Sequence, residues 1–170
     1  CPPRGASDAF LAPYHIDRGK IYVRQRFAGS SLIDEERIAD AIEYTRFPVP
    51  DNQAYADTTS EPALVRAADL IGQIADPFYH RKIGGLYCEF AETGFAETLG
   101  YKTPMDLMEQ FPQFFWKQVQ PLIGPALVHL EHTMEGKQWV AQLYNHVFQV
   151  SHRSSCLGPF PGAVDAAKTD

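Results

Sequence analysis

The spacing of the apolar residues is the feature of this sequence that most restricts its fold. Apolar side chains recur every three or four residues in one segment after another, and no segment of four or more residues alternates convincingly between apolar and polar side chains. The first pattern places apolar side chains on one face of an α-helix, whereas alternation is typical of a half-buried β-strand. The sequence therefore predicts an all-α protein, a bundle of helices around an apolar core.

The clearest helix is expected between Ser60 and Ala75. Ser60, Glu61 and Pro62 combine a hydroxyl N-cap, an acidic first turn and a proline near the first helical position, which together favour a helix start. Pro77 ends the segment because it cannot donate a backbone hydrogen bond. Five apolar residues predict the buried face of this helix: Leu64, Ala67, Ala68, Ile71 and Ile74.

Further helices are expected on both sides of this one. The expected ranges are about 16–28, 35–44, 78–92, 103–110, 111–122 and 125–148, the last as two helices or as one helix broken near Glu135-Gly136. In the first two ranges the spacing predicts the buried residues Gly19, Tyr22, Val23 and Phe27, and then Ile38, Ala41 and Ile42.

The length and composition predict one globular domain. A chain of 170 residues with 45% apolar and 21% charged side chains can form one core and lies outside the composition of disordered chains. Residues 1–8 and 151–170 lack helical periodicity and are expected to be a flexible lead-in and a flexible tail. The single helical domain is therefore expected to cover residues 9–150.

The charge balance excludes some classes of partner. A net charge of −6 gives no diffuse attraction to nucleic acid or to an anionic membrane surface, so neither is expected as a partner.

The cysteines and the apolar runs bear on the location of the protein. There is no C-x-x-C pair among Cys1, Cys88 and Cys156, and the chain lacks a secretory signal and a membrane span of roughly 18 apolar residues. A soluble, cytoplasmic protein is predicted.

Asp69 is the main candidate for a chemical role. It lies among small and aliphatic residues on an expected core helix, where a carboxylate must be neutralised, hydrogen-bonded or bound to a cation. Gln73 and Asp76 follow one and two turns later, so the three side chains share one stripe. A polar cleft is one interpretation of this stripe. The other is an ion pair between Asp69 and Arg66 at the edge of the apolar face.

The histidines give weaker signals. His15 directly precedes an expected helix, where an imidazole can cap the helix or point into a cleft, although a surface or packing role is the alternative. His129 and His132 have a spacing that can chelate a metal if a third ligand comes from elsewhere. Their neighbours Glu131 and Glu135 favour a solvated acidic face instead.

Four stretches of the sequence resemble bacterial proteins of the His-Asp, or HD-domain, metal-dependent phosphohydrolase superfamily. The resemblance spans roughly residues 15–150, and the stretches that carry it are RFPVP at 46–50, LVRAADLIGQIADP at 64–77, GYKTP at 100–104 and EGKQW at 135–139. In that superfamily a histidine, a His-Asp pair and a final aspartate hold one or two divalent metals in a helical bundle. Its members hydrolyse phosphomonoesters or phosphodiesters.

The resemblance implies roles for four residues of this chain. Asp69 matches the final aspartate ligand, and His15 matches an additional histidine that some members place at the start of a helix. Arg18 and Arg66 are the corresponding candidates for phosphate contacts. A divalent metal ion is the implied cofactor, a phosphorylated small molecule or nucleotide is the implied partner, and a homo-oligomer remains open.

The sequence also departs from the superfamily pattern, because it contains no adjacent His-Asp pair. A single carboxylate cannot fix the geometry in which a metal activates water. One hypothesis is that ligand-bearing N-terminal helices precede Cys1, which the missing initiator methionine favours, and that the chain is most of a phosphohydrolase. The second is a non-catalytic helical scaffold with a regulatory or partner-binding role. A helical domain that binds a small ligand is a third, based only on the aromatic content.

Overall fold

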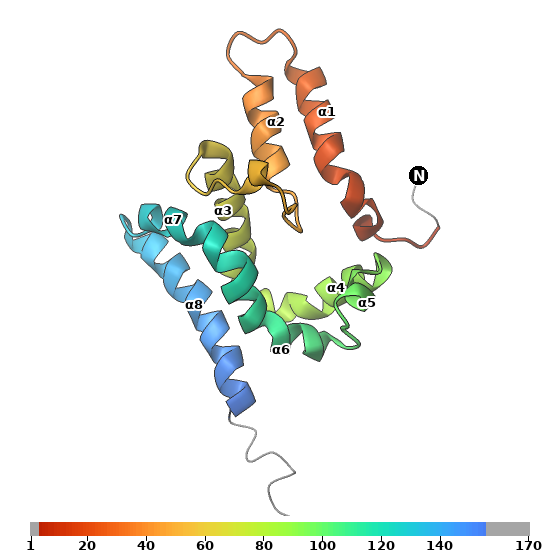
Figure 1. The fold of residues 1–170 in the computed structure, drawn as a ribbon, viewed down its shortest axis with the longest axis vertical. Coiled ribbons are helices and arrows are strands. Elements are labelled where there is room, and N and C mark those ends of the chain that lie inside the picture. The colour runs from red at the N-terminus through yellow and green to blue at the C-terminus, as the bar shows by residue number, and fades with distance from the viewer. Residues whose placement is uncertain (1–3, 156–170) are drawn as a thin grey trace, which may run out of the picture.

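The computed structural model describes residues 4–155, and this range is helical with no strand. The predicted all-α class is therefore confirmed. Figure 1 shows the elements in chain order: η1 (Asp8–Tyr14), α1 (His15–Phe27), α2 (Glu35–Tyr44), η2 (Gln53–Tyr55), α3 (Glu61–Ile74), α4 (Tyr79–Glu92), α5 (Phe95–Thr98), α6 (Pro104–Phe114), the π-helical segment η3 (Phe115–Val119), α7 (Gln120–Leu130) and α8 (Met134–Ser155).

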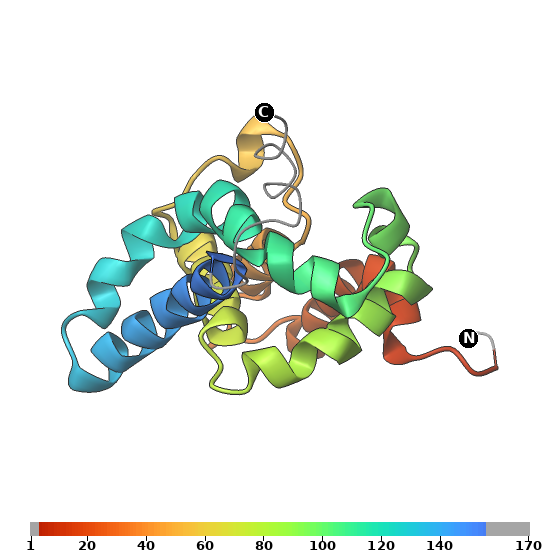
Figure 2. The same ribbon diagram turned by 90° about the horizontal axis from the view of Figure 1, so that it is seen from below.

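The α3 helix is the centre of the fold. It packs against α2 through one part of its surface and against α7 and α8 through another, and Figure 2 shows α8 lying across it. The core joins residues of α3, of the run from α6 to α7, and of α8: Ala67, Leu70, Ile71, Ile74, Phe111, Phe115, Val119, Ile123, Leu143 and Val147. The predicted face of this helix is mostly confirmed, but Ala68 is exposed and Leu70 is buried in its place.

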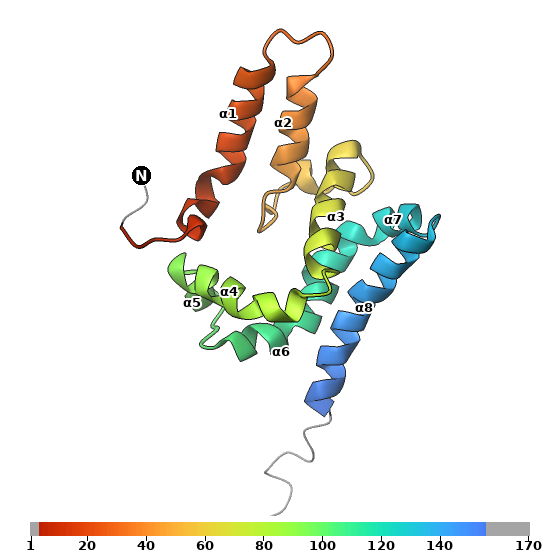
Figure 3. The ribbon, with the colours of Figure 1, turned by 180° about the vertical axis from the view of Figure 1, so that it is seen from behind.

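The α1 and α2 helices form an antiparallel hairpin that stands out from the rest of the bundle (Figures 1 and 3). The two helices approach closely at Gly19, where an added Cβ would lie 3.5 Å from Cγ2 of Ile42. Because the contact is centred there, Ile16 and Val23 turn toward α2 and are buried. The prediction that Tyr22 is buried is wrong, since its side chain is 62% exposed.

The prediction of the buried face of α2 also needs correction. Ala39 is fully buried, whereas Ile38 is 36% exposed. Asp34 caps the start of α2, since its side chain accepts a hydrogen bond from the Arg37 amide.

Helices α6 to α7 form one continuous, bent run. Thr103 begins it with a capping box, in which its hydroxyl accepts from the Asp106 amide and the Asp106 carboxylate accepts from the Thr103 amide. The π-helical segment ends two residues before Pro121, which has no amide to donate to a preceding carbonyl. The break between α7 and α8 falls after Leu130, a few residues earlier than predicted.

The structure tests the predicted domain limits only in part. Helix α8 continues to Ser155, beyond the expected end of the domain at 150. Residues 1–3 of the expected lead-in and residues 156–170 of the expected tail lie outside the described residues. Between residues 4 and 155, no helix has the length and apolar character needed to cross a membrane.

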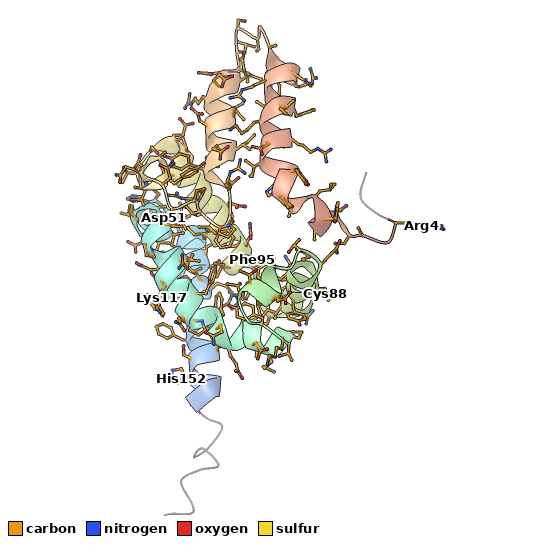
Figure 4. All side chains as sticks on the ribbon, turned by 45° about the vertical axis from the view of Figure 1, so that its right-hand side comes forward. Arg4, Asp51, Cys88, Phe95, Lys117 and His152 are labelled. Carbon is orange, nitrogen blue, oxygen red and sulfur yellow. The ribbon has the colours of Figure 1, made fainter. Side chains whose placement is uncertain are left out.

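Cys88 is a free, exposed cysteine on α4 (Figure 4).

Candidate functional site

Asp69 lies near the middle of α3 on the side that the other helices leave uncovered. The expectation that it is buried is wrong, because its side chain is exposed. The Gln73 side-chain amide donates to Oδ1 of Asp69 over 3.0 Å, so these two residues of the predicted stripe do meet. Asp76 does not join them. Its carboxylate accepts from the Phe78 amide over 2.7 Å and pairs with the Lys82 ammonium group.

Arg66 lies on another side of α3 and does not pair with Asp69. Its side chain is 1% exposed, and its two terminal nitrogens donate to the backbone carbonyls of Tyr55 over 2.9 Å and Asp57 over 2.6 Å. The guanidinium carbon also lies 5.2 Å from the centre of the Tyr44 ring. Burial lowers the pKa of the Arg66 guanidinium. Arg66 therefore holds the loop before α3, and its guanidinium is not accessible to a phosphate.

His15 and Arg18 both lie on exposed parts of α1. His15 is the first residue of that helix, and its Nδ1 donates to the backbone carbonyl of Ala12. Arg18 forms no ion pair with the residues that the structure describes. Its guanidinium therefore remains available to an anionic ligand.

The donor atoms present do not complete a metal site. Within the described part of the chain, no three side chains of histidine, cysteine, aspartate or glutamate lie close enough together to hold a metal ion. Neither His15 nor Asp69 belongs to such a group there, and neither does His129 or His132, both of which are exposed. Among these candidate ligands, Asp69 offers one accessible carboxylate. A divalent cation requires several ligands.

A cluster of histidine and tyrosine rings lies at the junction of α3, α4 and α8. His146 is 2% exposed, and its Nδ1 donates to the Ile74 carbonyl over 2.8 Å. Its Nε2 lies 3.3 Å from the Gln142 amide nitrogen, its ring stacks on Tyr79 at 5.7 Å, and the His80 ring is 4.8 Å away. Burial raises the pKa of the Tyr79 hydroxyl. Sequence reasoning assigned His80 and His146 no role.

A second cluster missed from the sequence joins α1, α2 and the following loop around Glu43. The carboxylate of Glu43 accepts from Arg46 Nε over 2.6 Å, Lys20 Nζ over 2.6 Å and the Tyr55 hydroxyl over 2.7 Å. Arg46 also donates to Asp17 over 2.8 Å. The Arg46 hydrogen bond is the main cause that lowers the pKa of Glu43 to about 2. The two anions, Asp17 and Glu43, balance the two cations, Lys20 and Arg46. This cluster, called the Glu43 clamp below, therefore holds α1, α2 and the loop together and leaves no net charge for a ligand.

These features define an all-helical protein whose central helix carries one exposed carboxylate without a cationic partner among the described residues. The chain belongs to the family described as Npun_R2479-like, which it matches over residues 2–153. That description states no activity. No curated protein and no solved structure matches the chain.

Proposed function

We propose that this chain is the helical part of a metal-dependent phosphohydrolase of the HD-domain type, in which Asp69 is one ligand of a divalent cation. The observation that carries the proposal is the state of this carboxylate. Asp69 is exposed on the central helix and no cation of the described residues neutralises it. The resemblance of the α3 sequence to the helix that carries the final aspartate of that superfamily supports the same role.

The surroundings of Asp69 suit a ligand that other donors approach. Gln73 holds one carboxylate oxygen, and such a hydrogen bond fixes the orientation of a ligating group. Ala68 and Gly72 beside it are exposed, and an added Cβ at Gly72 would meet nothing within 4 Å. Carboxylate oxygen is the donor that hard divalent cations prefer. In this proposal the remaining ligands come from outside the described residues.

The proposed substrate is a phosphorylated small molecule or a nucleotide, and the proposed location is the cytoplasm. Arg18 is the better of the two arginine candidates for a phosphate contact, because its side chain is exposed and forms no ion pair with the described residues. Arg66 is withdrawn from this role, since two backbone carbonyls occupy its guanidinium.

The second candidate function is a non-catalytic helical scaffold that binds a partner or regulates one. The lack of a three-donor group among residues 4–155 favours it, because a scaffold needs no ligand set. Both candidates predict the same fold, so they are separated by metal content and turnover and not by structure.

The test uses the protein expressed from its complete reading frame. We expect bound divalent metal by elemental analysis and hydrolysis of p-nitrophenyl phosphate or its bis ester. We expect Asp69→Asn to lower the activity by roughly a hundredfold and to lower the metal content. Asp40→Asn is the matched control, since Asp40 is another exposed aspartate in a helix. A wild-type protein without bound metal or turnover contradicts the proposal and favours the scaffold.

A further inference from the structure

The segment η1 connects the start of the α1–α2 hairpin to the distant helix α4. The Ser7 amide donates to Oε1 of Glu92 over 2.9 Å, and the Ser7 hydroxyl donates to Oε2 over 2.5 Å. The same hydroxyl accepts from the Ala9 amide over 3.2 Å, which caps η1. One serine therefore begins η1 and also attaches it to a residue 85 positions away.

Burial contributes little to this attachment. None of the seven residues of η1 is buried, although the segment contacts both α1 and α4. Its largest apolar side chain, that of Phe10, is 40% exposed. Few buried apolar contacts are typical of the segments that open first in a folded protein. The attachment of η1 to α4 therefore depends strongly on the two hydrogen bonds that Ser7 donates.

The other attachment of the hairpin is stronger. Helix α2 packs on α3, and the loop between these two helices is held by the Glu43 clamp and by the buried Arg66. Figures 1 and 3 show the hairpin joined to the bundle through α2, with η1 at the foot of α1 beside α4. Because η1 continues directly into α1, release of η1 would leave the hairpin attached mainly through α2. Such an element can turn about its remaining attachment.

We propose that η1 is a strap that fixes the position of the α1–α2 hairpin, and that loss of the contact between Ser7 and Glu92 frees the hairpin to turn about α2 and α3. A carboxylate only accepts hydrogen bonds, so the strap stays closed while Ser7 presents its two donors. A negative charge at position 7 removes the hydroxyl donor and repels Glu92, which opens the strap. The proposal does not depend on the proposed hydrolase activity.

The test measures the distance between the hairpin and α4 in the full chain. One spin label is attached to Cys88, the exposed cysteine of α4, and the other to Leu32→Cys, since Leu32 is 94% exposed between α1 and α2. Cys1→Ser and Cys156→Ser leave only these two positions to react. We expect one narrow distance distribution for this labelled parent chain by double electron–electron resonance.

Glu92→Ala removes both acceptors from the strap. We expect it to broaden the distance distribution and to speed amide hydrogen exchange of residues 9–14 by roughly tenfold, without changing exchange in α3. Glu89→Ala is the matched control, because Glu89 is also an exposed glutamate of α4, and it should leave both measurements unchanged. A Glu92→Ala chain with the distribution of the parent overturns the proposal, and so does a parent chain whose distribution is already broad.

Variants of Ser7 separate release of the strap from a general loss of stability. Ser7→Thr keeps both donors and should keep the narrow distribution, whereas Ser7→Asp places two carboxylates together and should broaden it as Glu92→Ala does. Combining Ser7→Asp with Glu92→Lys restores opposite charges and should narrow the distribution again. A broad distribution for Ser7→Thr, or a double variant as broad as Ser7→Asp alone, contradicts the strap.

Discussion

Nδ1 of His146 on α8 lies 2.8 Å from the carbonyl oxygen of Ile74, the last residue of α3. A carbonyl only accepts hydrogen bonds, so this nitrogen carries the proton and Nε2 is left to accept from the Gln142 amide. A backbone carbonyl near a helix end has no partner within its helix, and here a side chain from another helix supplies one. The contact therefore ties α8 to the end of the central helix.

We expect His146→Ala to lower the free energy of unfolding by about 2–4 kcal/mol, because it opens a cavity and leaves the Ile74 carbonyl without its donor. His146→Asn keeps an amide donor near the position of Nδ1, so it should lose less stability than His146→Ala. Urea unfolding followed by circular dichroism measures both. His129→Ala, at an exposed position of α7, is the control and should change little. Equal stability of His146→Ala and wild type would show that the contact contributes nothing.

Arg66 has the same kind of structural role for the loop before α3. Its planar guanidinium reaches two carbonyls at once, which the single ammonium group of lysine does with difficulty. We expect Arg66→Lys to lower the free energy of unfolding by about 2 kcal/mol and to speed proteolysis between residues 46 and 60. Arg37→Lys makes the same chemical change at an exposed ion pair with Glu61 and should affect neither measurement. Unchanged proteolysis of Arg66→Lys would contradict this role.

The sequence predicted the helices well because their signals are local. Caps, prolines and three-to-four spacing act within a few residues, and the helix around Asp69 and the helices that begin near residues 35 and 103 were predicted on that basis. The choice of buried face was less accurate. Which side of α1 is covered depends on the approach of α2 at Gly19, and a contact between two helices leaves no trace in the spacing of one of them.

The site was harder to predict for a related reason. Burial of Asp69 was inferred from its apolar neighbours, but α3 leaves one side uncovered, and the sequence does not reveal which side. His146 was overlooked although a usable signal existed. It lies within the apolar spacing of Leu143, Val147 and Val150, and a histidine in such a stripe indicates a buried polar contact. Its partner Ile74, 72 residues away, could not be predicted.

The turn between α7 and α8 depends on Gly136. A Cβ at this position would overlap the backbone oxygen of Leu130 and lie 2.7 Å from its carbonyl carbon, so the backbone would have to move. We expect Gly136→Ala to destabilise the fold by about 1–3 kcal/mol in urea unfolding. Gly84→Ala is the matched control in α4, where an added Cβ meets nothing within 4 Å, and it should stabilise by roughly 0.5–1 kcal/mol. Similar effects of the two variants would refute the role of Gly136.

The Glu43 clamp predicts an acid-dependent loss of stability. Arg46 and the other donors lower the pKa of Glu43 from 4.5 to about 2, so the folded state favours the carboxylate form. A lowered pKa contributes stability that is present above the unfolded value of 4.5 and is lost as the pH falls toward about 2. Glu43→Gln should therefore cost on the order of 2 kcal/mol at neutral pH, and the difference from wild type should shrink across this window.

Urea unfolding of both proteins at a series of pH values between about 7 and 2 measures that difference. Glu36→Gln removes a carboxylate from the more exposed ion pair with Arg24 and is the control, because solvent weakens such a pair. Its effect should be smaller at every pH. A difference between Glu43→Gln and wild type that stays constant from neutral to acidic pH would show that Glu43 keeps its ordinary pKa. The cluster would then hold α1, α2 and the loop together by packing and not by charge.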